Sequence, residues 1–349
     1  MISSPGKVLF YGGYSILVPG HRGLSIAVKD KNGRGANAEI IEGENRLISP
    51  EFGLDGTPDP STLVGLAYET ASDYLRSFGY DRRPALKLWN SEIFGRPDEK
   101  SGLGSSAAIT VSVIKTLFLA NDIDPAAHIE TVHKLAQWVH AKHFHKTGSG
   151  FDIATASFGR TIVYARYDPA VIKEDWRSTI QPPWKGLRAE PFEWPRAYDL
   201  LYFNLRGAAA RTEQYVKVFS QWKKQRPEEF KRLMTLQNEH EAQAIAALRR
   251  ADDEAVKEFT HKAREVHKEV DRQMRAINPN AKAIEPDVLT KFINKAEEIE
   301  GVVAGRCPGA GGWDGVAFIV RAGFDQWEAI KELGREMGIQ MQRIELVVV

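Results

Sequence analysis

A glycine-rich segment at residues 101–108 constrains the fold of this 349-residue chain more than any other feature. The segment consists, in order, of Ser101, Gly102, Leu103, Gly104, Ser105, Ser106, Ala107 and Ala108, and an apolar run typical of a helix follows directly. Glycines let backbone N–H groups approach an anion without a β-carbon in the way, and a helix that begins there directs its positive end at the same point. The segment therefore predicts a loop and helix that bind a phosphorylated ligand.

The two adjacent hydroxyls add to this prediction. Ser105 and Ser106 provide side-chain donors, and a serine oxygen is also a ligand that magnesium accepts. The segment is not a Walker loop, because no Gly-Lys-Ser/Thr ends it. The alternative is a plain glycine turn with a serine N-cap, which many globular proteins use.

Length and composition describe a globular protein with more than one core. A chain of 349 residues exceeds the size at which one core stops growing, and we expect two domains, residues 1–190 and 191–349, divided near a stretch rich in Trp and Pro. Lys and Arg number 47 against 46 Asp and Glu, a net charge of +1, so no overall field favours nucleic acid or a membrane surface.

The cysteine count and the pattern of apolar residues bear on the cellular compartment of the protein. A single cysteine, Cys307, excludes an internal disulfide. The chain shows neither a signal-peptide pattern at its start nor an apolar stretch long enough to span a bilayer. We therefore expect a cytoplasmic protein, and the sequence leaves oligomer formation open.

The order of predicted elements is that of an α+β protein. Short strand patterns alternate with turns in the first 41 residues, and strand and helix patterns are mixed up to residue 205. Residues 212–275 are helical by pattern, with breaks at Pro227 and at Asp252, and predict a helical hairpin with a solvated charged face. Strand and helix patterns alternate again to the C-terminus.

Three further segments carry candidate chemistry. The first contains Lys7 at the start of a strand that ends in two glycines and Tyr14. The second, residues 146–154, places Asp152 just after a glycine turn, where it is either a functional carboxylate or an N-cap. The third, residues 309–315, has four glycines in seven positions, which indicates that something approaches the backbone closely or, alternatively, a plain loop.

Together these motifs resemble the GHMP kinases. The resemblance rests on Pro-Gly-Lys at residues 5–7, Gly-Leu-Gly-Ser-Ser-Ala-Ala at 102–108 and Gly-Ala-Gly-Gly at 309–312; it extends from residue 4 to about residue 319 and is loose in the helical middle. It implies an N-terminal domain like ribosomal protein S5 domain 2, a ferredoxin-like C-terminal domain carrying the helical hairpin, and ATP bound between them with Mg²⁺.

The resemblance also implies roles for individual residues. The catalytic candidates are Lys7, beside the transferring phosphoryl group, and Asp152, the family's carboxylate. The residues expected to hold the ATP phosphates are Gly102, Leu103, Gly104, Ser105, Ser106 and Ala107, with Ser106 as the magnesium ligand. The residues expected at the acceptor are Tyr14, Lys146, Ser149, Gly150, Arg211, Thr212, Ala310 and Gly311.

Within the family, the segments at residues 12–14, 148–152 and 309–314 look most like those of members that phosphorylate phosphomevalonate, whereas mevalonate-using members usually carry Gly-Glu-His in the first segment. We expect transfer of phosphate from ATP to 5-phosphomevalonate, in isoprenoid synthesis. The alternatives are another GHMP kinase, acting on mevalonate or a sugar phosphate, and a non-catalytic ligand sensor. The sensor is disfavoured because Lys7, Ser106 and Asp152 are all present.

One expectation concerns the acceptor, and two concern metal ligands. A phosphomonoester has a second pKa of about 6 and is mostly deprotonated at neutral pH, so we expect Lys7 to matter more than Asp152. Mevalonate kinases supply a glutamate to magnesium from the helix before the aspartate, whereas this chain has Gln137, His140 and Lys142 there and no acid after Glu130. His140, His143 and His145 are expected to pack or lie at the surface, since no further His or Cys completes a zinc site.

Overall fold

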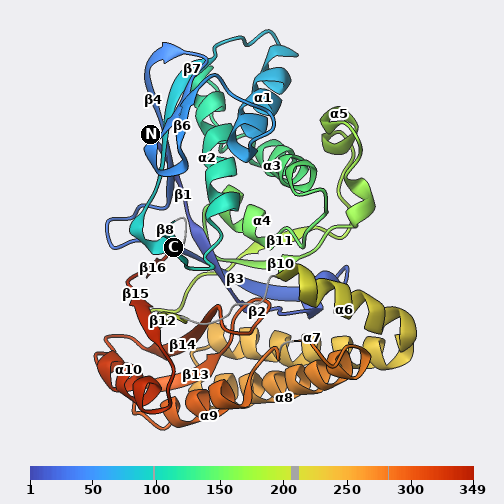
Figure 1. Ribbon diagram of the computed structural model, residues 1–349, viewed down its shortest axis with the longest axis vertical. Coiled ribbons are helices and arrows are strands. Elements are labelled where there is room, and N and C mark those ends of the chain that lie inside the picture. The colour runs from blue at the N-terminus through green and yellow to red at the C-terminus, as the bar shows by residue number, and fades with distance from the viewer. Residues whose placement is uncertain (97–98, 206–211, 282) are drawn as a thin grey trace. The chain divides into compact units, whose positions relative to one another are not determined.

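The chain forms two compact units in a computed structural model that describes residues 1–96, 99–205, 212–281 and 283–349 (Figure 1). The first unit consists of Met1–Lys7, Ile26–Pro191 and Val349, and the second of Val8–Ser25 and Phe192–Val348. The chain passes between the units inside two strands, β2 (Gly6–Tyr11) and β3 (Arg22–Lys29). The second unit therefore contains residues 8–25 from near the N-terminus. The expected division into residues 1–190 and 191–349 does not include this exchange.

The first unit is built on a five-stranded sheet with the order β1-β4-β7-β5-β6. Its other strands pair as β10 with β11 and as β8 with β9. The strands are β1 (Ile2–Ser4), β4 (Ala36–Glu44), β5 (Leu47–Ser49), β6 (Leu54–Gly56), β7 (Pro84–Asn90), β8 (Gly95–Arg96), β9 (Glu99–Lys100), β10 (Ile162–Ala165) and β11 (Arg188–Pro191). The helices are α1 (Leu63–Arg76), α2 (Ser105–Ala120), α3 (Ile129–His143), α4 (Phe151–Phe158) and α5 (Trp176–Ile180).

Helix α2 is the centre of this unit. It packs on β1, β4 and β7 on one side and on α1, α3 and α4 on the other, as Figure 1 shows. Its sequence is apolar on almost every face because these neighbours surround it, and Val111, Ile114 and Leu117 are fully buried. The glycine-rich segment at residues 101–108 therefore leads into the best-buried helix of the unit, which fixes the position of its N-terminus.

The second unit contains an antiparallel sheet with the order β13-β14-β12-β15. Numbered by their order in the chain, these four strands lie as second, third, first and fourth across the sheet, which is the ferredoxin-like arrangement and confirms the expected α+β fold. The strands are β12 (Tyr198–Leu205), β13 (Val302–Arg306), β14 (Gly315–Arg321), β15 (Met341–Ile344) and β16 (Val347–Val348). The helices are α6 (Thr212–Gln225), α7 (Pro227–Arg249), α8 (Asp253–Ile277), α9 (Asp287–Ala296) and α10 (Trp327–Glu336).

Two cores stabilise the second unit. One lies between the sheet and the helices α9 and α10, and includes Phe203, Phe292 and Phe318. The other lies among α6, α7 and α8 and includes Trp222 and Tyr14. Burial of such aromatic side chains stabilises the fold by about 2–3 kcal/mol each.

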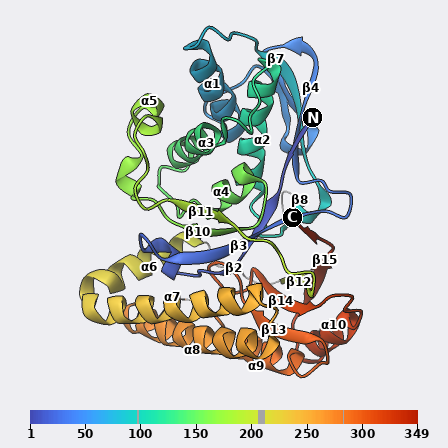
Figure 2. The same ribbon diagram turned by 180° about the vertical axis from the view of Figure 1, so that it is seen from behind.

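The expected helical segment is three helices, and its hairpin consists of α7 and α8, which lie side by side in Figure 2. The first break falls at Arg226, where Pro227 begins α7, and the second at the turn around Ala251, which has a φ of 53°. In the parts of the chain that the structure describes, no helix has the length and apolar character needed to cross a membrane.

Candidate functional site

Lys7 lies directly against the glycine-rich loop. Its backbone N–H donates to the carbonyl of Leu103 (2.8 Å), and its Nζ donates to the carbonyl of Gly102 (2.6 Å). The side chain passes over Gly104, where a β-carbon would lie 3.1 Å from Cε of Lys7. The Lys7 ammonium is also 5.5 Å from the centre of the Phe151 ring. The structure thus brings the glycine-rich loop and the segment at residues 146–154 together around the ammonium group of Lys7.

The loop ends at the N-terminus of α2 without using its serines as caps. Gly104 occupies the N-cap position in the left-handed conformation, with a φ of 83°, and no side chain caps the helix. Ser105 and Ser106 are the first helical residues and are half-buried, while Leu103 and Ala107 are buried. The serine N-cap alternative is therefore wrong, and the first N–H groups of α2 have the orientation that favours an anion.

Ser106 has a neutral partner. Its Oγ is 3.4 Å from Nε2 of His140 on α3. Burial lowers the pKa of His140, and the Asp152 carboxylate opposes this shift, so at neutral pH the ring adds no positive charge beside Ser106. A hydroxyl oxygen beside an uncharged ring fits a magnesium ligand, because Mg²⁺ takes hard oxygen donors and keeps several waters and phosphate oxygens.

A protein-only metal centre is not part of this arrangement. Among residues 1–96, 99–205, 212–281 and 283–349, no three His, Cys, Asp or Glu side chains form a group that would hold a metal. Gln137 is buried and forms hydrogen bonds described below, so it does not replace the missing glutamate. Ser106 remains the candidate protein ligand.

Asp152 lies in the first turn of α4, a helix that the sequence pattern did not predict. Gly150 is the N-cap, with a φ of 81°, so Asp152 is not the cap. Its Oδ1 accepts the N–H of Ile153 (2.9 Å), and the side chain is half-buried. An acid at this position is stabilised by the helix dipole.

Buried side chains donate to the carbonyls of four consecutive residues before Asp152, residues 147–150. Arg166 donates to the carbonyls of Thr147 (3.2 Å) and Gly148 (2.9 Å), and Tyr164 donates to that of Ser149 (2.8 Å). The fourth contact, Gln137 Nε2 to the carbonyl of Gly150, measures 2.7 Å. All three donors are buried, and they therefore fix the backbone of residues 147–150.

These three donors were not predicted as site residues. Tyr164 and Arg166 follow an alternating strand pattern in which nothing marks them, and Gln137 appeared only as the residue where an acid was missing. Their role depends on contacts between residues 13 to 19 positions apart, which a local pattern does not contain.

His133 holds the side chain of Gln137 and makes the stability of the fold depend on pH. The amide nitrogen of Gln137 donates to Nε2 of His133 (3.0 Å), and its oxygen accepts the hydroxyl of Tyr167 (2.9 Å). Burial and the neighbouring Lys134 lower the pKa of His133 to about 3. The folded protein therefore keeps this ring neutral, and the unfolded chain takes up a proton below about pH 6.5.

We expect His133→Gln to flatten the acid side of the stability profile. As the pH falls from 6.5 toward 3, His133 binds a proton in the unfolded state but stays neutral in the folded state. This difference lowers the free energy of unfolding by up to about 1.4 kcal/mol per pH unit. Urea unfolding at several pH values between 4 and 6 measures the slope. The exposed His128→Gln is the control; equal slopes in wild type and His133→Gln would contradict the assignment.

In the second unit, two predicted segments meet at Tyr14. Its hydroxyl donates to the carbonyl of Ala310 (3.1 Å), and its ring is buried against Phe219, with ring centres 5.3 Å apart. The loop at residues 309–312 is anchored at both ends: Gly309 N–H donates to the carbonyl of Leu9 (2.9 Å), and Gly312 N–H to that of Ile284 (2.6 Å). Tyr14, Ala310 and Gly311 thus form one substructure.

The remaining predicted residues are less informative. Lys146 is exposed in the α3–α4 connection, where its backbone N–H donates to the carbonyl of Ala141 (3.0 Å). Thr212 begins α6, and Arg211 lies outside the described residues. Their assignment to the acceptor remains a prediction.

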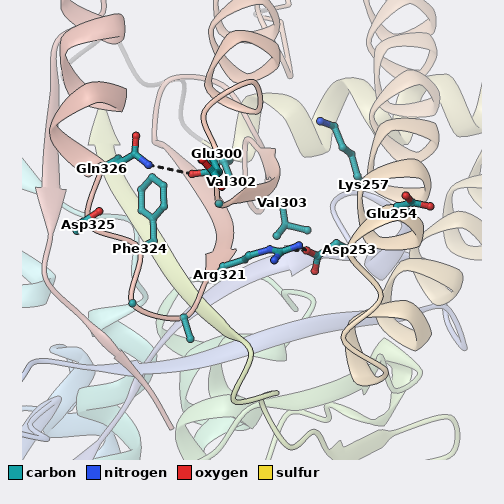
Figure 3. A pocket seen from close by; sticks show the side chains of 13 residues that line it. Asp253, Glu254, Lys257, Glu300, Val302, Val303, Arg321, Phe324, Asp325 and Gln326 are labelled. Carbon is teal, nitrogen blue, oxygen red and sulfur yellow. Dashed lines mark hydrogen bonds and ion pairs between the residues drawn. The ribbon is translucent and has the colours of Figure 1, made fainter.

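A cavity of about 510 Å³ in the second unit contains none of the predicted site residues. Figure 3 shows Arg321 directed at Asp253 across it, with an Nη2 to Oδ2 distance of 2.5 Å. Gln326 likewise donates to the carbonyl of Glu300 (3.4 Å). Because the cavity contains none of the predicted residues, we do not place the candidate site there.

Comparison with known proteins agrees with the motifs. Residues 65–160 match the model of the GHMP kinases N terminal domain. The chain is 30% identical over 329 residues to a phosphomevalonate kinase of Saccharolobus solfataricus, which covers 90% of this chain and 88% of that protein. It is 34% identical over 278 residues to a phosphomevalonate kinase of Candida albicans, which covers 72% of this chain and 61% of the relative. The chain spans 53 to 61% of the length of three such fungal relatives.

A solved structure shares the fold. Streptococcus pneumoniae phosphomevalonate kinase, in a complex with phosphomevalonate and AMPPNP, aligns over 98% of this chain and 99% of its own with a TM-score of 0.75. The sequence identity is 20%, so this likeness supports the two-domain α+β fold expected from the motifs.

Proposed function

Because the chain belongs to the phosphomevalonate kinase family of GHMP kinases, we propose that it transfers the γ-phosphoryl group of ATP to the phosphate of (R)-5-phosphomevalonate. The products are 5-diphosphomevalonate and ADP, and the reaction belongs to the mevalonate pathway of isoprenoid synthesis. The relatives support the reaction, and the contacts of Lys7 with the glycine loop are the observation in this structure that carries it.

The proposed role of Lys7 follows from its place. Phosphoryl transfer spreads negative charge over the oxygens of the transferring group, and catalysis consists mainly of positioning and of charge stabilisation. The ammonium of Lys7 and the first N–H groups of α2 are positive groups fixed at the same loop. Gly102, Leu103, Gly104, Ser105, Ser106 and Ala107 would hold the phosphates of ATP there.

The chemistry of the acceptor determines whether Asp152 has to act as a general base. An acceptor phosphate with a second pKa of about 6 already presents a deprotonated oxygen at neutral pH, so no base has to remove a proton. We infer that Asp152 orients Lys7 or the substrate. The loop beneath it, with Ser149 and Gly150, would contact the acceptor together with Tyr14, Lys146, Arg211, Thr212, Ala310 and Gly311.

Magnesium has one proposed protein ligand in this scheme. The hydroxyl of Ser106 would hold the ion, which supplies neutralisation of the phosphate charge when bound. His140 keeps Ser106 in place without adding a positive charge near the metal.

Assays of ADP release with three acceptors test the proposal. We expect turnover with 5-phosphomevalonate and at least a hundredfold lower kcat/KM, a difference of about 2.7 kcal/mol, with mevalonate and with galactose. A preference for mevalonate or galactose would move the chain to another branch of the GHMP kinases. Absence of turnover with all three would favour a ligand sensor and contradict the proposal.

A further inference from the structure

A buried polar network lies beneath the turn that carries Tyr14. Arg306 on β13 donates to Glu241 on α7 (3.2 Å) and to Nδ1 of His267 on α8 (3.3 Å). Ser15 joins through its hydroxyl, which donates to Glu241 (3.1 Å), and Gln237 through its amide (2.8 Å). The exposed fractions of Glu241, Arg306 and His267 are 0%, 1% and 2%. The network therefore ties α7, α8 and β13 to the N-terminal segment of the second unit.

His267 is placed in this network with one nitrogen toward the turn. Because Nδ1 accepts from Arg306, the ring proton is on Nε2. Burial and the charge of Arg306 lower the pKa of His267 to about 3, so the ring is neutral. Nε2 has no hydrogen-bond partner in the described structure, which is unfavourable for a buried donor. The position of the ring, rather than a hydrogen bond of Nε2, distinguishes this residue.

The ring occupies the space that a side chain at position 13 would need. A β-carbon built on Gly13 would lie 2.3 Å from Nε2 of His267 and 2.5 Å from Cε1. These ring atoms belong to a side chain held by Arg306 and cannot move away freely. Gly13 and His267 are thus sterically matched: the ring fits because residue 13 has no side chain.

The same ring also contacts Tyr14. The rings of His267 and Tyr14 meet edge to face, with centres 6.2 Å apart, and Phe219 packs on Tyr14 as well. The hydroxyl of Tyr14 then reaches the carbonyl of Ala310. His267 therefore supports two consecutive residues of the segment that we place at the acceptor.

We propose that His267 is a positioning residue for the acceptor phosphate ester: it fixes Gly13 and Tyr14 against Ala310 and keeps position 13 free of a side chain. This inference rests on the proposed function. A side chain at position 13 would collide with the imidazole, and an acidic one would also repel the dianionic phosphate of the acceptor.

Four proteins test the pairing: wild type, Gly13→Ala, His267→Ala and the double variant. We expect His267→Ala to raise the KM for phosphomevalonate about tenfold or more, with the KM for ATP changed by less than about threefold. Gly13→Ala should lower kcat/KM about a hundredfold in wild type and less than about tenfold when His267 is already alanine, since neighbouring residues couple. Part of the loss remains in the double variant because Gly13 has a φ of 37°.

Two further variants keep the test decisive. His267→Gln retains an acceptor for Arg306 and replaces His267→Ala if that variant does not fold; the same selective rise in KM is expected. His240→Ala, on α7 against Phe259, is the matched control and should leave both KM values unchanged. Equal changes in the two KM values, or an equal cost of Gly13→Ala in both backgrounds, would overturn the inference.

The outcome is separable from failure of the proposed function. If wild type does not use phosphomevalonate, the proposed function fails. The thermal unfolding midpoints of the same four proteins then still report whether Gly13 and His267 are coupled. Non-additive midpoints are expected, and additive midpoints would overturn the pairing.

Discussion

Replacing Lys7 with alanine is expected to lower kcat about a thousandfold, which corresponds to about 4 kcal/mol of lost transition-state stabilisation. Lys7 is the ammonium fixed at the glycine loop, 2.6 Å from the carbonyl of Gly102. Asp152→Asn keeps the shape of the side chain and should lower kcat about tenfold, because a phosphate acceptor needs no general base. Steady-state ADP release at saturating ATP and phosphomevalonate measures both.

A control variant and one contradicting outcome accompany the comparison of Lys7→Ala with Asp152→Asn. Lys31→Ala removes an exposed lysine from the turn between β3 and β4 and should leave kcat unchanged. If Asp152→Asn lowers kcat as deeply as Lys7→Ala, proton removal is part of the rate-limiting chemistry, and the proposed order of importance is rejected.

Among glycine-to-alanine substitutions in the second unit, Gly311→Ala is expected to lower activity most. A β-carbon at Gly311 would lie 2.2 Å from the carbonyl oxygen of Ile284, the atom that accepts the N–H of Gly312 at 2.6 Å. The backbone oxygen cannot move without breaking this hydrogen bond, so the loop at residues 309–312 must shift with Ala310 on it. We expect kcat/KM to fall at least a hundredfold, or about 2.7 kcal/mol.

Gly309→Ala is the matched control in the same loop. Gly309 and Gly311 have positive φ values of 64° and 75°, but nothing lies within 4 Å of a β-carbon at Gly309. Both variants pay the backbone penalty of about 1–2 kcal/mol for a left-handed alanine, and only Gly311→Ala adds the clash. Measurement of kcat/KM together with urea unfolding separates the two; equal effects would show that the contact with Ile284 does not matter.

The sequence predicted those parts of the site that depend on neighbours in the chain. Glycines beside serines and a following apolar helix indicated the loop at residues 101–108, and the structure places Lys7 against it. The hairpin of α7 and α8 followed from the helical spacing of apolar residues, and Pro227 and Asp252 located the breaks before and after α7. Tyr14 and Ala310 were both predicted for the acceptor, and they are joined by a hydrogen bond.

The parts that were missed depend on packing between distant segments. Helix α4 is only eight residues long, and its apolar run after Gly150 has no distinct helical period. Strand β13 contains Arg306, whose burial is tolerated only because Glu241, 65 residues earlier, pairs with it. His267 is one of two histidines in the charged helix α8, and only the structure places its ring at Gly13.

The central claim is that the acceptor oxygen belongs to a phosphate group, and phosphorus NMR of the purified product tests it most directly. After incubation of the protein with ATP, Mg²⁺ and 5-phosphomevalonate, we expect a product with two mutually coupled phosphorus resonances, as in a diphosphate ester. A product with two uncoupled monoester resonances would show transfer to a hydroxyl group and contradict the account.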